Sequence, residues 1–122
     1  MTSKRIMVVD DAEFTRKMLT LEVEQAGYKV VAEAENGLEA VDLYKIHQPD
    51  IVTMDIVMPG MGGIEAVKKI IEINPNAKIV MLSSMGVGAS VQDAVAAGAK
   101  NFILKPYSTS RLIEVLDKTL AL

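Results

Sequence analysis

Four apolar segments of this 122-residue chain end on side chains that can bind a cation or a phosphoryl group. The side chains that follow them are Asp10 and Asp11, Asp55, Ser83, and Lys105. Carboxylates held ~4 Å apart at an effective dielectric of ~20 repel each other by about 4 kcal/mol per pair. A cluster of these three acids would therefore need a cation. Oxygen ligands of this kind favour Mg²⁺ over zinc.

Acids, one lysine and one hydroxyl form a set suited to phosphoryl transfer. A carboxylate can attack phosphorus in line while positive charge neutralises the phosphoryl oxygens, which makes Asp55 the candidate nucleophile. Asp10 and Asp11 leave one segment together and are better placed as metal ligands. Lys105, followed by a proline that can hold a cis peptide bond, can supply fixed charge, and Ser83 can donate its hydroxyl to a phosphoryl oxygen.

Each of these residues also has an ordinary structural interpretation. Asp55 can cap a turn, and paired aspartates can cap a helix. Serine before glycines is typical of a turn, and a lysine at a strand end is usually solvated. Their joint occurrence at strand ends favours the functional interpretation.

The elements that must position these side chains alternate between strand and helix. Short apolar runs predict five strands, at 6–9, 29–32, 51–55, 78–82 and 101–104, and a helical segment follows each. This order predicts an α/β fold with a parallel sheet, right-handed crossovers and helices on both faces. Because parallel strands end at one edge, we expect the following to converge there: Asp10, Asp11, Asp55, Ser83 and Lys105.

The helical segments are predicted from apolar residues that share a face. The expected faces are Phe14, Met18 and Leu21; Gly37, Ala40, Val41 and Tyr44; Ile64, Val67 and Ile71; Val87, Val91, Ala94, Val95 and Gly98; and Leu112, Val115, Leu116 and Leu120. The small residues of the fourth face bury little area, so we expect that helix to be held least firmly. The charged ends of 29–32 suit an edge strand, 60–63 reads as a flexible loop, and Ser108 can cap the last helix.

Composition limits the classes of function. A net charge of −3 argues against a nucleic-acid partner, which normally requires a basic surface. There is no cysteine, no apolar run near the roughly 18 residues of a membrane span, and no recognisable leader. We therefore expect one domain over residues 1–122, located in the cytoplasm without a membrane partner. The single histidine, His47, reads as a solvated surface residue.

The chain resembles the receiver domain of two-component response regulators from Arg5 to its end. The resemblance depends on the motifs Val8-Val9-Asp10-Asp11, Met54 to Met61 with Gly63, Ser83-Ser84-Met85, Ala97-Gly98-Ala99, and Phe102 to Tyr107. It is greatest to the stand-alone receivers of chemotaxis systems. The resemblance implies a flavodoxin-like (βα)5 fold with strand order 2-1-3-4-5.

The resemblance also implies the chemistry. A sensor histidine kinase would pass a phosphoryl group to Asp55, with Mg²⁺ bound directly by Asp11, Asp55 and the backbone carbonyl of Val57, and by Asp10 through water. Such a protein is a phosphoacceptor rather than an enzyme acting on other substrates. Ser83 would move toward the phosphoryl group, Phe102 would rotate into the space vacated, and the face of the fourth helix, fifth strand and fifth helix would change.

The partners implied are the kinase, a downstream target such as the flagellar motor switch, and a phosphatase. A phosphorelay intermediate and a regulator of another pathway remain open alternatives. A haloacid dehalogenase-type phosphatase would need an acid where Val57 stands, and a flavodoxin-like electron carrier would not place Asp10-Asp11 in its phosphate loop. An interaction domain with an inactive site does not account for the complete set of site residues.

The sequence departs from the family pattern at a few positions. Gly62 stands where the family often has Asp or Asn, which predicts a looser loop after Asp55. Phe102 replaces the commoner Tyr and so lacks a hydroxyl for a partner. Val57 and Met85 flank the path of hydrolytic water in this family, and neither side chain can orient a water molecule.

Overall fold

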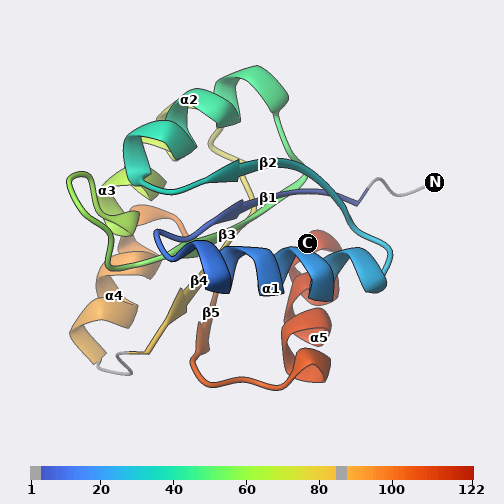
Figure 1. The fold of residues 1–122 in the computed structure, drawn as a ribbon. Helices are drawn as coiled ribbons and strands as arrows, with labels where there is room; N and C mark the ends of the chain where they lie inside the picture. The colour runs from blue at the N-terminus through green and yellow to red at the C-terminus, as the bar shows by residue number, and fades with distance from the viewer. Residues whose placement is uncertain (1–3, 85–87) are drawn as a thin grey trace.

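The computed structural model describes residues 4–84 and 88–122 as one parallel sheet between two layers of helices (Figure 1). The strands are β1 (Arg5–Val9), β2 (Lys29–Ala34), β3 (Ile51–Asp55), β4 (Ile79–Ser83) and β5 (Asn101–Leu104). The helices are α1 (Glu13–Gln25), α2 (Gly37–His47), α3 (Gly63–Ile73), α4 (Gly88–Ala97) and α5 (Thr109–Leu120). The strand order β2-β1-β3-β4-β5 confirms the predicted topology.

Each face of the sheet contributes to its own hydrophobic core. Alternate side chains of a strand point to opposite faces, so Met7 and Val52 pack under α2, α3 and α4, whereas Ile6 and Ile51 pack under α1 and α5. Figure 1 shows these two helix layers on either side of the sheet. Burial on both faces explains why the central strands read as unbroken apolar runs.

The two edges of the sheet are β2 and β5. The edge position predicted for the segment after Lys29 is confirmed, and the strand extends to Ala34. The pairing of β1 with β2 shifts register between Ile6 and Met7. Asn36 then caps α2, because its side chain accepts a hydrogen bond from the Glu39 N–H at 2.8 Å.

The predicted apolar face of α1 is wrong. Phe14, Met18 and Leu21 are 77%, 45% and 54% exposed. The helix instead buries Leu19 and Val23 in the core that it shares with α5. The three predicted residues do share helical spacing, but they occupy a face turned away from the sheet.

The faces predicted for α2 and α5 are buried as expected, and Ser108 caps α5 by accepting from the Arg111 N–H at 3.0 Å. On α3, Val67 is buried, while Ile64 and Ile71 are partly buried against the core. On α4 the prediction fails at Val95, which is 61% exposed, while Ala94 and Ala97 are buried. Val87 lies outside the described residues.

Helix α4 packs chiefly against α3 and buries small side chains, which agrees with the expected light packing. Within 4–84 and 88–122, no helix combines the length and apolar character that crossing a membrane requires.

Candidate functional site

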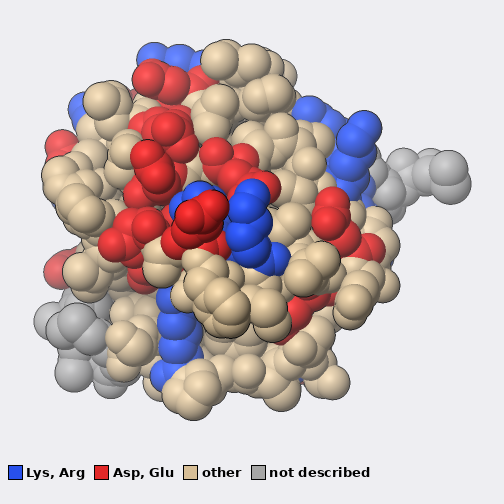
Figure 2. Space-filling view, in the orientation of Figure 1, with Lys and Arg blue, Asp and Glu red and all other residues tan. Residues whose placement is uncertain are grey.

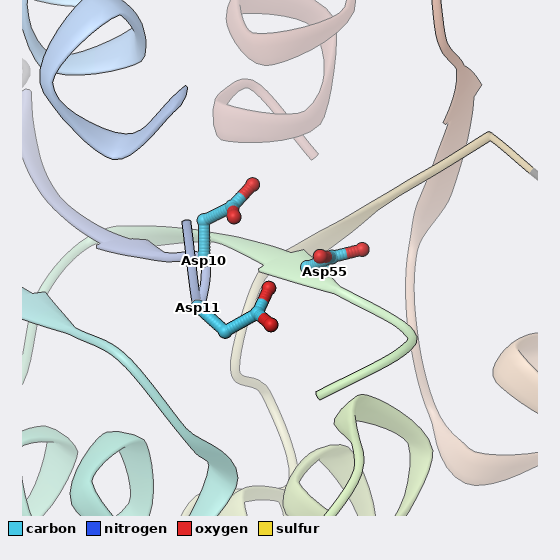
Figure 3. Close-up of side chains that lie close together, drawn as sticks. All are labelled: Asp10, Asp11 and Asp55. Atoms are coloured by element: carbon cyan, nitrogen blue, oxygen red, sulfur yellow. The ribbon is translucent and has the colours of Figure 1, made fainter. Parts of the chain in front are cut away.

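Three carboxylates meet at the carboxyl edge of the sheet. Asp10 and Asp11 follow the end of β1, and Asp55 is the last residue of β3 (Figure 3). One oxygen from each side chain lies within 4.8 Å of the others. Asp10 is buried, Asp55 is partly buried and Asp11 is exposed, so the cluster opens to solvent on one side. This convergence was predicted from the order of the elements.

Asp10 is the buried member and both of its carboxylate oxygens have partners. Oδ1 accepts a hydrogen bond from the Ala12 N–H at 2.9 Å, and Oδ2 lies 3.2 Å from the Lys105 ammonium. Lys105 follows β5 and is joined to Pro106 by a cis peptide bond. The lysine therefore reaches the acid cluster, as expected, and its ion pair is with Asp10.

The pKa of Asp55 lies above its ordinary value of 3.8, chiefly because burial disfavours the charged form. The negative charges of Asp10 and Asp11 raise this pKa further. The Lys105 ammonium and the Ile56 N–H act in the opposite direction and lower it. Removing the negative charge of its two neighbours, or adding a cation, would favour ionised Asp55.

The other predicted residues lie on or just after β3, β4 and β5 and differ in burial. Ser83, at the end of β4, is 2% exposed, and its backbone carbonyl accepts from the Lys105 N–H at 2.8 Å. Phe102, on β5, packs against the core beneath α2, α3 and α4. Val57 follows Asp55 by two positions and its side chain is 60% exposed. Met85 lies outside the described residues.

His47 lies beside the amino-terminal end of β1, away from the carboxyl ends of the strands where the acids meet. Its backbone carbonyl accepts from the Arg5 guanidinium at 2.6 Å, at the start of β1, and the residue is partly buried rather than fully solvated. It does not belong to the cluster of Asp10, Asp11 and Asp55.

The loop between β3 and α3 is tied to its surroundings by backbone hydrogen bonds. The Gly63 N–H donates to the Ile56 carbonyl at 2.9 Å, and the Gly37 N–H donates to the Met61 carbonyl at 3.2 Å. A Cβ at position 63 would overlap the Asp55 backbone carbonyl, so only glycine fits there. The segment 60–63, predicted as a flexible loop, is thus held by hydrogen bonds at Met61 and Gly63.

A groove lies next to the cluster and shares Asp11 with it. It has a volume of about 560 Å³ and is lined by Asp11, Glu35, Asn36, Leu38, Pro59, Gly60 and Met61. Figure 2 shows acidic side chains gathered on this face of the molecule, over the junction of β2 with α2 and the start of α1.

Sequence reasoning missed two residues near the cluster. Arg16, on α1, donates from Nη1 to the Asp10 backbone carbonyl at 2.9 Å. Tyr107 is close enough for Asp10 to influence its phenol, whose pKa is raised to about 12 by burial, then by Glu22 and Asp10. No sequence signal identified Arg16, because one of its partners is a backbone carbonyl and the other, Glu33, is brought close only by the fold.

Comparison with known proteins identifies the family. The response regulator receiver domain model matches residues 6–117. The chain belongs to this family.

Two curated relatives of this receiver are chemotaxis proteins. The CheY protein of Thermotoga maritima is 56% identical over 94% of this chain and 96% of its own length. The CheY protein of Bacillus subtilis is 53% identical over 95% of this chain and 97% of its own length. The receiver is therefore closely related to CheY, and the resemblance to chemotaxis receivers expected from its motifs is confirmed.

A solved structure gives the same family assignment. The CheY chain in the CheX–CheY–BeF3–Mg²⁺ complex from Borrelia burgdorferi superposes with a TM-score of 0.91 and is 37% identical. The match covers 97% of this receiver and 89% of that chain.

Proposed function

We propose that this receiver is the phosphoacceptor of a two-component system, with Asp55 as the residue that is phosphorylated. The observation that carries the proposal is the meeting of three carboxylates from β1 and β3 with the Lys105 ammonium at one edge of the sheet. Asp55 lies at the end of the central strand β3, and its pKa is raised, chiefly by burial. The proposal takes residues 1–122 as a single receiver domain.

The reaction follows from the side chains. A carboxylate oxygen of Asp55 attacks phosphorus in the phosphohistidine of a sensor kinase, and the phosphorus–nitrogen bond breaks. The electron pair stays on the departing imidazole, and the new bond makes a mixed anhydride on Asp55. Lys105 and the Ser83 hydroxyl then hold phosphoryl oxygens. This is a self-modification, reversed by hydrolysis, rather than turnover of another substrate.

The residues at the cluster fit Mg²⁺, because all donors are oxygens and three of them lie within 4.8 Å. Asp11, Asp55 and the backbone carbonyl of Val57 would hold the ion directly, and Asp10 through water. Bound Mg²⁺ supplies positive charge that offsets repulsion among the acids and neutralises phosphoryl oxygens. The Mg²⁺ named in the Borrelia burgdorferi complex supports this choice.

The output is a change in the face formed by α4, β5 and α5. Phosphorylation draws the Ser83 hydroxyl toward the phosphoryl group, and Phe102 rotates toward the space that it leaves. The small buried residues Ala94 and Ala97 hold α4 lightly, which suits an element with two arrangements. Because the curated relatives are chemotaxis proteins, the flagellar motor switch is the favoured target. A phosphatase is the expected partner for signal removal, and CheX, which is bound in the Borrelia burgdorferi complex, is a further candidate partner.

Phosphorylation is tested with acetyl phosphate and with a purified sensor kinase, by mass spectrometry and radiolabel. The wild-type protein is expected to gain one phosphoryl group with Mg²⁺ and none with chelator. Asp55→Asn should gain none, whereas Asp42→Asn, which changes an exposed acid of α2, should label like wild type. Labelling of Asp55→Asn at the wild-type rate would assign the nucleophile elsewhere.

The partner is tested by capture from cell extract with and without beryllofluoride. Capture of a motor-switch protein by the beryllofluoride form of wild type, and not by Asp55→Asn, supports the chemotaxis assignment. Capture of a histidine phosphotransfer protein instead would favour the alternative, a phosphorelay intermediate.

A further inference from the structure

Arg16 joins three elements around the acid cluster. It lies on α1, and its side chain is only 12% exposed. Nη1 donates to the backbone carbonyl of Asp10 at 2.9 Å, and Nε donates to Glu33 Oε1 on β2 at 3.3 Å. An arginine that is largely buried and bonded at two points is fixed in place, unlike an ordinary charged residue on a helix surface.

The bond to Asp10 acts on the turn that carries two of the acids. The Asp10 N–H donates to the Ala34 carbonyl at 3.1 Å, and the Asp10 side chain accepts from the Ala12 N–H at 2.9 Å. Arg16 occupies the remaining backbone group of Asp10, its carbonyl. Asp11, which is exposed, therefore projects from a turn that is held on both sides by β2 and α1.

We propose that Arg16 is a positioning residue for the metal site, holding the Asp10–Asp11 turn so that both carboxylates face Asp55. This inference rests on the proposed function, because it assumes that the cluster binds Mg²⁺. The physical basis is the planar guanidinium, whose separate N–H donors bond a carbonyl and a carboxylate at the same time. A lysine ammonium is a single compact group on a flexible stem and does not hold the two acceptors in the same fixed geometry.

The direction of the change in Mg²⁺ affinity distinguishes a positioning role of Arg16 from a purely electrostatic one. A positive charge next to a cation site repels Mg²⁺, so a purely electrostatic role predicts that Arg16→Ala binds Mg²⁺ more tightly and that Arg16→Lys is unchanged. Positioning predicts weaker binding in both variants. Loss of a residue that orients metal ligands typically weakens metal affinity by about 10-fold to 100-fold.

The test is titration calorimetry of MgCl2 into the full chain. We expect the dissociation constant to rise about 10-fold for Arg16→Ala and for Arg16→Lys. The matched control is Lys17→Ala, because Lys17 is the next residue of α1 and pairs with the same Glu33 without a bond to Asp10. It should bind Mg²⁺ like wild type. Unchanged or tighter binding in Arg16→Lys would overturn the inference.

A second measurement excludes a merely structural effect. Labelling rates with acetyl phosphate over a range of Mg²⁺ should show a raised half-saturating Mg²⁺ concentration for Arg16→Lys, with a plateau close to wild type. A lower labelling rate at saturating Mg²⁺, with an unchanged half-saturating Mg²⁺ concentration, would contradict the positioning role of Arg16. Arg16→Lys keeps the charge and most of the side-chain stem, so it serves even where Arg16→Ala does not fold.

Failure of this inference is distinguishable from failure of the proposed function. If wild type itself binds no Mg²⁺, or if Asp11→Asn and wild type bind it equally, the metal site and the proposed function are wrong. If wild type binds Mg²⁺, Asp11→Asn does not, and both Arg16 variants match wild type, only the role of Arg16 is wrong.

Discussion

The Lys105 ammonium lies 3.2 Å from the carboxylate of Asp10, a residue that is 2% exposed. This ion pair joins the end of β5 to the end of β1, across β3 and β4. The Lys105 ammonium, which we propose contacts the phosphoryl group, is paired with Asp10 in this structure, and its positive charge also lowers the pKa of Asp55.

Replacing Lys105 should destabilise the fold as well as block function. Lys105→Met leaves the buried Asp10 carboxylate without its cation, and we expect the free energy of unfolding at pH 7 to fall by about 1–3 kcal/mol. Denaturant unfolding followed by circular dichroism measures this. Lys100→Met, at an exposed position before β5, is the control and should change little. Equal midpoints for both variants would show that the pair contributes nothing.

Stability should depend on pH through Asp55. Its pKa in the folded state lies above the ordinary value of 3.8, mainly because of burial. As the pH rises past 3.8, the Asp55 carboxyl loses its proton in the unfolded chain before it does so in the folded protein. Ionisation of Asp55 therefore lowers the free energy of unfolding until the pH passes the folded-state pKa. In chelator, Asp55→Asn should therefore match wild type near pH 3 and become the more stable protein as pH rises.

The measurement is the unfolding free energy of both proteins at a series of pH values. Adding Mg²⁺ at neutral pH should narrow the difference in unfolding free energy between Asp55→Asn and wild type, because a bound cation favours the charged form of Asp55. A stability difference between the two proteins that stays constant with pH would contradict the raised pKa of Asp55.

Val57 is predicted to prolong the phosphorylated state. Its apolar side chain, 60% exposed and two residues after Asp55, cannot hydrogen-bond an attacking water. Val57→Asn supplies an amide that can, so its phosphate release should be severalfold faster than that of wild type. Release is followed after removing excess acetyl phosphate, and Val57→Thr, which has a shorter polar group, gives a graded comparison. Equal release rates for wild type and Val57→Asn would refute the prediction.

The predictable features were those fixed by order along the chain. Apolar runs of four or five residues identify strands, and the alternation of strand and helix predicts parallel strands, whose carboxyl ends lie at one edge of the sheet. That is why Asp10, Asp55 and Lys105 could be grouped from the sequence. Pairing within the group could not be predicted, because the contact between Lys105 and Asp10 depends on strand register and side-chain reach.

The missed features have identifiable physical causes. The α1 sequence carries two apolar faces, and periodicity alone does not tell which one packs against the sheet. The predicted face, Phe14, Met18 and Leu21, is exposed, and Leu19 and Val23 are buried instead. Arg16 was missed because its partners are a backbone carbonyl and Glu33, which come together only through pairing of β1 with β2.

Residue 62 offers a test of how the loop after Asp55 is held. Gly62 is the N-cap of α3 and has no side chain to accept a hydrogen bond, although its φ of −74° and ψ of 172° suit any residue. Gly62→Asn should stabilise the fold by about 0.3 kcal/mol, because glycine is itself tolerated at an N-cap and the new side chain adds an acceptor like that of Asn36 at α2. Gly63→Ala is the contrast and should destabilise it, because the new Cβ overlaps the Asp55 carbonyl. Thermal unfolding measures the stability of both variants. Equal changes in stability would contradict the close approach of the Asp55 carbonyl to position 63.

Thr53 and Thr119 form a matched pair for testing buried hydroxyls. Both are 0% exposed, but within the described chain the Thr53 hydroxyl has no hydrogen-bond partner. Thr119 Oγ1 donates to the Val115 carbonyl at 2.7 Å and accepts from the Asn101 amide at 2.9 Å. Thr53→Val removes an unsatisfied polar atom and should raise the free energy of unfolding by about 1 kcal/mol, whereas Thr119→Val should lower it by about 1–3 kcal/mol. Because the chain has no tryptophan, far-ultraviolet circular dichroism is the appropriate probe. Destabilisation of Thr53→Val would mean that its hydroxyl has a partner, such as a buried water molecule, in solution.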